Sequence, residues 1–114
     1  MPFVTFTKDD SGPQVLTFQG KITFGRETER VRQKLKEMAE QGENRFIFDL
    51  ESVDWVDSAG IGFLVMCLTT LGQAGARLRL TNLPERVRYV LGITRLNTVF
   101  EIFETRQAAL RNFK

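Results

Sequence analysis

The chain has 114 residues, of which 42% are hydrophobic and 26% are charged, so we expect residues 1–114 to form a single globular domain. Sixteen Lys and Arg residues against fourteen Asp and Glu residues give a net charge of +2, which falls short of the concentrated basic surface typical of nucleic-acid binding. The chain contains no histidine, which excludes nucleophile–histidine pairs and every imidazole metal site.

The first predicted elements are a β-hairpin and an amphipathic helix. Residues 4–7 and 14–19 are rich in β-branched and aromatic side chains, and the turn-forming cluster 9–13 separates them. Apolar residues then recur at helical spacing over 26–41, and Gly42 is placed to end that helix. The inner stripe of the helix is Val31, Leu35, Met38 and Ala39.

The middle of the chain alternates between buried strands and a buried helix. Residues 45–50 form a nearly continuous apolar run, which predicts a strand covered on both faces, as in a parallel sheet. Residues 59–74 are apolar but interrupted, and they are too few to cross a bilayer, which needs about 20 apolar residues. We therefore predict a buried helix there, followed by a short strand over 77–80.

The last third predicts two more helices around a final strand. Asn82 and Pro84 are placed to start a helix that runs to Leu96, with the inner stripe Val87, Val90, Leu91 and Thr94. Residues 99–103 predict a strand, and Thr105 is placed to cap a terminal helix with the inner face Ala109, Leu110 and Phe113. The sequence thus predicts an α/β sandwich: a mixed sheet of four to five strands, an N-terminal hairpin and about four helices.

A polar pair, Asp57 and Ser58, stands where a loop enters the most apolar helix. Such a junction exposes free backbone N–H groups and the positive end of the helix dipole, which favour an anion. Asp57 is expected to be the N-cap, which places the Ser58 hydroxyl in the first turn, facing solvent and open to modification. Capping alone also explains this pair, but it does not explain Gly60 and Gly62, which leave room for another backbone or a phosphate.

Other residues near this junction leave alternatives open. Trp55 either packs over the end of the sheet or anchors an interface, and Phe24 is either a core residue or an exposed contact; burial is the favoured interpretation of both. The basic residues of the first and third helices alternate with Glu, which favours solvated faces over RNA or membrane binding. These residues are Arg30, Arg32, Lys34, Lys36, Arg86, Arg88 and Arg95.

Three segments, 48–50, 53–62 and 75–80, resemble the STAS domain (sulphate transporter and anti-sigma factor antagonist), particularly its free-standing bacterial antagonists. The most specific part is Val-Asp-Ser-Ala-Gly-Ile-Gly at 56–62, which is similar to the family signature Asp-Ser-(Ser/Thr/Ala)-Gly-(Leu/Ile)-Gly. Ser58 falls on the phosphoacceptor serine of that signature. The resemblance covers essentially the whole chain and implies the STAS fold.

The resemblance implies a partner switch in transcription regulation. The unphosphorylated antagonist would bind a GHKL-type anti-sigma factor kinase and thereby release a sigma factor. The kinase would use ATP to phosphorylate Ser58 and abolish the binding, and a PP2C-type phosphatase would restore it. The chain would be a substrate and not an enzyme. The implied partner-binding residues are Thr23, Asp57, Ser58, Ala59, Gly60, Ile61 and Gly62.

The loop after the second predicted strand departs from the family pattern. Lys21 and Thr23 stand at two positions where the family usually carries acidic residues. The loss of these carboxylates could alter kinase pairing or a Mg²⁺ contact, while Lys21 could instead pair with the phosphate or with an acidic partner residue. Two alternative functions are an accessory subunit that binds the ATPase of a lipid-transport ABC system, and a stressosome-like scaffold component.

Several chemistries lack support in the sequence. Cys67 cannot form an internal disulfide and lies among apolar residues, which predicts an inert core side chain. Four carboxylates fall within nine residues: Asp49, Glu51, Asp54 and Asp57. Acid–base catalysis needs a pocket, which so small a chain hardly provides. We expect no enzyme activity, cofactor or metal. The N-terminus lacks a secretory signal pattern, so we expect a cytoplasmic protein without membrane insertion.

Overall fold

A computed structural model of the chain describes residues 3–114, so Met1 and Pro2 of the predicted domain lie outside the described residues. Five strands form one mixed sheet in the order β1-β2-β3-β4-β5. β1 pairs antiparallel with β2, and the remaining neighbours are parallel, which confirms the predicted hairpin and mixed sheet. The strands are β1 (Val4–Lys8), β2 (Gln14–Ile22), β3 (Arg45–Val56), β4 (Arg77–Thr81) and β5 (Glu101–Phe103).

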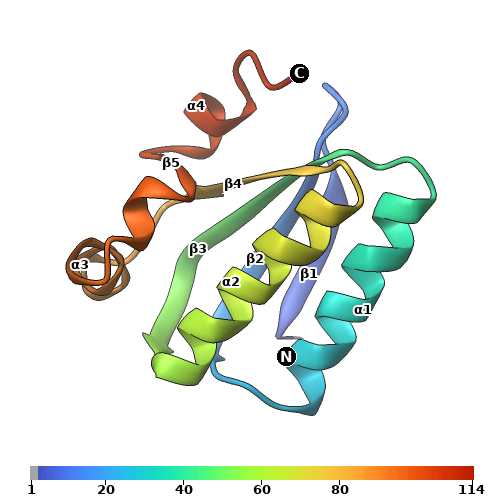
Figure 1. The fold of residues 1–114 in the computed structure, drawn as a ribbon. Helices are drawn as coiled ribbons and strands as arrows, with labels where there is room; N and C mark the ends of the chain where they lie inside the picture. The colour runs from blue at the N-terminus through green and yellow to red at the C-terminus, as the bar shows by residue number, and fades with distance from the viewer. Residues whose placement is uncertain (1–2) are drawn as a thin grey trace.

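The helices cover both faces of the sheet unequally. They are α1 (Arg26–Glu40), α2 (Ser58–Gln73), α3 (Glu85–Ile93), the 3-10 helix η1 (Leu96–Thr98) and α4 (Arg106–Leu110). α1 and α2 lie side by side over one face, and α4 packs on β3, β4 and β5 (Figure 1). None of the helices within residues 3–114 is long and apolar enough to span a bilayer.

The core follows from the alternation of side chains along the strands. Phe46 and Phe48 of β3 face α1 and α2 in the larger cluster, whereas Ile47 points to the opposite face and joins the smaller cluster under α4. All residues of 46–50 are buried, which confirms the strand predicted to be covered on both faces. The single cysteine, Cys67, is fully buried in the larger cluster, as predicted, and burial raises the pKa of its thiol.

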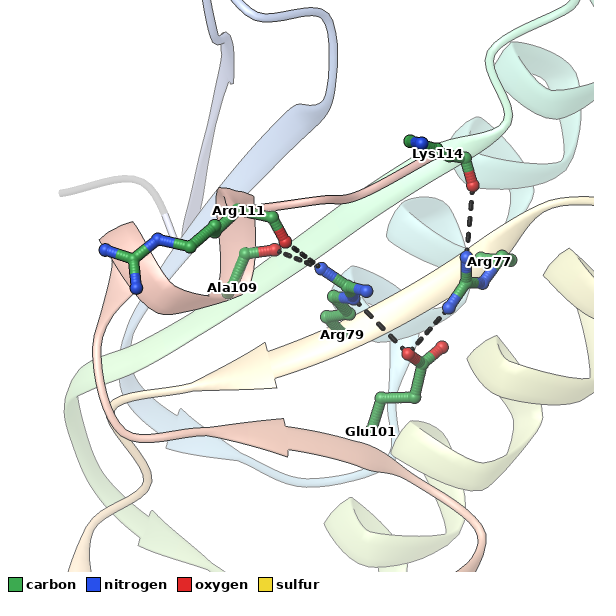
Figure 2. A network of polar contacts seen from close by, with 6 residues as sticks. All are labelled: Arg77, Arg79, Glu101, Ala109, Arg111 and Lys114. Atoms are coloured by element: carbon green, nitrogen blue, oxygen red, sulfur yellow. Dashed lines mark hydrogen bonds and ion pairs between the residues drawn. The ribbon is translucent and has the colours of Figure 1, made fainter.

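Two arginines of β4, the buried Arg79 and the exposed Arg77, hold the C-terminal segment on the outer face of the sheet (Figure 2). Arg79 is only 6% exposed and donates hydrogen bonds to the carbonyl groups of Ala109 and Arg111 at 2.9 and 3.0 Å. The Glu101 carboxylate accepts from Arg79 at 3.3 Å and from Arg77 at 2.7 Å. Charge and hydrogen bonds therefore stabilise the sheet on the face that only the short α4 covers.

β3 and α3 differ most from their predicted lengths. β3 continues six residues beyond Leu50, because β2 supplies backbone partners through two register shifts as far as the Ile22–Val56 pair. α3 starts later and ends earlier than predicted: Pro84 is its N-cap, Asn82 adopts a left-handed conformation, and Arg95, at φ 61°, turns the chain away after Ile93. The long β2–β3 pair places the ends of both strands beside the start of α2.

Candidate functional site

The site is the junction where β3 ends and α2 begins, beside the end of β2. Asp57 is the N-cap of α2, as predicted, and its Oδ1 accepts the Gly60 N–H at 2.7 Å. The other carboxylate oxygen, Oδ2, accepts the Thr23 hydroxyl at 2.8 Å. One carboxylate thus joins two segments that are 34 residues apart in the chain and orients the first turn of the helix.

The two hydrogen bonds also set the charge of Asp57. The Thr23 hydroxyl, and after it the Gly60 N–H, stabilise the charged carboxylate and hold the pKa of Asp57 below its usual value. Because the folded pKa is depressed, this interaction stabilises the fold above the ordinary Asp pKa and is lost as the pH falls through the folded value. Asp57 therefore carries a full negative charge at neutral pH.

Thr23→Val is expected to raise the pKa of Asp57 toward its ordinary value, because the largest stabilising contact of the carboxylate is removed. The stabilisation that Asp57 contributes above its ordinary pKa should then be smaller, and its loss on acidification should be complete at a higher pH. An NMR titration of the Asp57 carboxyl carbon measures the shift, and Thr5→Val, an exposed threonine on β1, is the matched control. An Asp57 pKa that is equal in both variants would contradict the assigned hydrogen bond.

Ser58 is the first residue of α2 and is exposed. Its hydroxyl has no hydrogen-bond partner among residues 3–114, so neither the backbone nor a neighbouring side chain occupies it. The next residue, Ala59, is also exposed. The hydroxyl therefore stands at the positive end of a 16-residue helix, where a phosphate can be attached without displacing an existing contact.

The two glycines of the predicted motif have different surroundings. A Cβ on Gly60 would lie 2.0 Å from the carbonyl oxygen of Ile22, so the end of β2 packs directly on the first turn of α2. A Cβ on Gly62 would meet no atom within 4 Å. Gly60 is thus explained by internal packing, whereas Gly62 leaves an open stretch of helix backbone that nothing within the described chain requires.

The structure brings the predicted partner-binding residues together but exposes only some of them. Thr23, Ser58 and Ala59 are exposed, and Asp57 and Gly62 are partly exposed. The other two are buried: Gly60 packs on β2, and Ile61, which is 8% exposed, belongs to the core. The surface that another protein could reach here consists of small side chains and helix backbone.

Two aromatic residues beside the junction are exposed. The favoured interpretation of Phe24 as a core residue is wrong, because its side chain is 51% exposed in the loop between β2 and α1. Trp55 is 44% exposed, and the packing favoured for it is limited to a cation–π contact with Arg86, whose guanidinium lies 4.9 Å from the ring centroid. β4 ends opposite Asp49, so no further strand covers the end of β3 on that side.

The four clustered carboxylates do not form a common pocket. Asp49 is 4% exposed and accepts hydrogen bonds from Arg106 at 2.8 and 3.1 Å and from Asn82 at 3.2 Å, on the outer face of the sheet. Glu51 and Asp54 are exposed, and Asp57 caps α2. Within the described residues, no group of three or more potential ligands is placed to hold a metal ion.

The basic residues near the site are mostly exposed. Lys21 is the cross-strand neighbour of Trp55 and forms no ion pair with a described residue. Among the basic residues assigned to solvated faces, Lys34 lies over the Phe6 ring, and Arg86 contacts Trp55. The sequence offered no signal for this contact, since the two residues are 31 positions apart and lie on elements whose arrangement depends on the whole sheet.

The comparisons with known proteins agree on one family. The sequence model described as the STAS domain matches residues 7–109. A Bordetella bronchiseptica protein named as the anti-sigma factor antagonist BtrV is 29% identical over 111 residues, which cover 97% of this chain and 94% of that protein. The anti-sigma-B factor antagonist of Bacillus subtilis is 36% identical over 72 residues, which cover 63% of this chain and 65% of that protein.

A solved structure has the same fold. TM1081 from Thermotoga maritima superimposes with a TM-score of 0.83 at 20% sequence identity, over 96% of this chain and 93% of that one. The mixed sheet, its helices and the Asp-Ser junction at the start of α2 therefore confirm the resemblance inferred from residues 56–62. By its sequence match over most of the chain and by its fold, this protein belongs to the STAS domain family.

Proposed function

We propose that this protein is an anti-sigma factor antagonist whose unphosphorylated form binds a GHKL-type anti-sigma factor kinase and thereby releases a sigma factor. Phosphorylation of Ser58 by that kinase abolishes the binding, and a PP2C-type phosphatase restores it. The names of the relatives from Bordetella bronchiseptica and Bacillus subtilis support this role. The chain acts as a substrate of the kinase, in the cytoplasm, and residues 1–114 work as one domain.

The observation that carries the proposal is the state of the Ser58 hydroxyl. It is exposed, it has no hydrogen-bond partner among the described residues, and it lies at the first position of α2. The transport-subunit alternative involves no phosphorylation cycle and does not require a free hydroxyl at this position. A phosphorylation switch does require it, because a kinase must reach the oxygen.

The charges of the site explain how one phosphate would end the complex. Phosphorylation adds a charge of about −1.5 to −2 beside Asp57, which is already negative because its pKa is lowered. A partner seated over Ser58 and Ala59 would have to bury this dianion together with the Asp57 carboxylate. In the free protein, the N-terminal N–H groups of α2 stabilise the phosphate, so no refolding is needed.

The test is to incubate the purified protein with ATP and each GHKL-type anti-sigma factor kinase of the organism that makes it. Mass spectrometry then maps the phosphate, with Ser58→Ala as the control. We expect a single phosphate on Ser58 and none on the variant. Modification at another residue, or no modification by a kinase that binds the chain, would overturn the proposal.

A further inference from the structure

The exposed part of the site lacks an anchor for a stable complex. A typical protein interface buries about 800 Å² on each partner, and its energy is concentrated in a few large side chains, above all Trp, Tyr and Arg. The accessible residues of the predicted surface, Thr23, Ser58 and Ala59, are all small. Large exposed side chains that could anchor a partner are Phe24, in the loop after β2, and those of neighbouring elements.

Such side chains lie at the end of β3 and on α3. Trp55, two positions before Asp57, contacts Arg86 on α3 at 4.9 Å from the ring centroid. Arg86, Tyr89 and Ile93 follow at positions i, i+3 and i+7, which places them on one face of the helix. Tyr89 is 66% exposed and Ile93 is 63% exposed. We call these four residues, Trp55, Arg86, Tyr89 and Ile93, the Trp55–Ile93 strip.

The side chains of the strip on α3 do not take part in packing that helix against the core. The side of the helix that faces the core is formed by Val87 and Leu91, which are 2% and 0% exposed. Tyr89 and Ile93 make no contribution to either hydrophobic cluster among the described residues. Large apolar side chains grouped on one exposed face mark a candidate contact surface for another protein.

The charges on the strip limit what can cover it. Arg86 forms no ion pair with a carboxylate of the described residues, and its guanidinium is bound only through the Trp55 ring. A second copy of this chain, docked by a two-fold axis across the strip, would bring Arg86 toward its own counterpart, which is unfavourable. The complementary surface is apolar with carboxylates that pair with Arg86.

From these observations we propose that the Trp55–Ile93 strip is the anchoring half of the interface with the anti-sigma factor kinase. The inference rests on the proposed function and extends it: the α2 junction carries the phosphate switch, and the strip supplies most of the binding energy. The kinase surface that docks on it is apolar and acidic. Trp55 lies two positions before the Asp57 cap and contacts Arg86 on α3, so one partner that covers the junction is placed to reach the strip.

The test is to measure the affinity of the kinase for Trp55→Ala, Tyr89→Ala and Ile93→Ser in their unphosphorylated forms. We expect each variant to weaken binding, with Trp55→Ala and Tyr89→Ala about tenfold or more weaker than the wild type. The melting temperature should change little, because these side chains are exposed. Val99→Ser is the matched control. Val99 is also apolar and exposed, at 55%, but it does not belong to the strip: it lies just before β5, whose first residue pairs with Arg79 of β4.

The outcomes separate the strip from the switch. If all three variants bind the kinase as tightly as the wild type, while binding still depends strongly on the Ser58 phosphate, the strip is not the anchoring surface. The proposed switch at Ser58 would then remain. Equal loss of affinity in Val99→Ser would also overturn the strip, since binding would then respond to any exposed apolar residue. If no kinase binds the wild-type chain, both proposals fail. Size-exclusion chromatography that shows a dimer dissociated by Tyr89→Ala, with kinase binding unchanged, would assign the strip to a second copy instead.

Discussion

Ser58→Asp is expected to weaken binding of the anti-sigma factor kinase about tenfold or more, which corresponds to about 1.4 kcal/mol or more of binding free energy. The new carboxylate would lie next to Asp57, whose negative charge is stabilised by hydrogen bonds from the Thr23 hydroxyl and the Gly60 N–H. A partner covering this point would bury two neighbouring negative charges. Isothermal titration calorimetry with the wild type and the variant measures the difference directly.

The stability of the folded chain should not follow the same change. Ser58 is exposed and its hydroxyl forms no hydrogen bond with a described residue, so nothing internal is lost. An acidic residue in the first turn of a helix is also favoured by the helix dipole. We therefore expect a nearly unchanged melting temperature for Ser58→Asp, which would show that its effect on binding is a local effect of charge.

A matched control is available on the same helix. Thr69 is exposed and lies eleven residues after Ser58, which places it on the same side of α2, about 16 Å further along the axis. At that distance a surface charge is largely screened at physiological ionic strength. Thr69→Asp should leave kinase binding unchanged, and Ser58→Ala should retain it. Equal weakening by Ser58→Asp and Thr69→Asp would attribute the effect to net charge and contradict a local switch.

Gly60→Ala is expected to destabilise the fold by about 3 kcal/mol or more, at the upper end of the usual cost of overpacking. The added Cβ would lie 2.0 Å from the carbonyl oxygen and 2.7 Å from the carbonyl carbon of Ile22. These are backbone atoms of the last residue of β2, so they cannot move aside by a change of rotamer. Urea denaturation should show a lower midpoint than for the wild type.

The same substitution at Gly62 provides the control. Its Cβ would meet no atom within 4 Å, and the residue lies in the second turn of α2. Alanine favours a helix over glycine by up to about 1 kcal/mol, so Gly62→Ala should keep or raise the stability. A similar loss of stability in both variants would contradict the close approach of β2 to α2. A loss of kinase affinity in Gly62→Ala alone would show that the partner approaches the bare backbone there.

The sequence predicted those elements whose signal is local. The apolar periodicity of α1 is confirmed by the burial of Val31, Leu35 and Ala39. The caps Asp57 and Thr105 were predictable because a short polar side chain before an apolar run has few other uses. The family signature at 56–62 is likewise a continuous segment, and it is the basis on which Ser58 is proposed as the phosphoacceptor.

The features that depend on distant segments were not predictable. The Thr23–Asp57 hydrogen bond joins residues 34 positions apart, and it exists only because β2 and β3 end together. The length of β3 depends on backbone partners from β2, since the apolar run in the sequence ends at Leu50. The exposure of Phe24 and Trp55 likewise depends on which elements lie above the strand ends. An aromatic residue in a sequence does not say whether anything covers it.

We propose that a phosphate on Ser58 controls the docking of a partner. The most direct measurement is the dissociation constant of the kinase for the protein before phosphorylation, after stoichiometric phosphorylation of Ser58, and after treatment with a PP2C-type phosphatase. We expect tight binding before phosphorylation and an affinity about tenfold or more lower after it. Treatment with the phosphatase should restore the original affinity. Equal affinity of the phosphorylated and unphosphorylated forms would contradict the proposal.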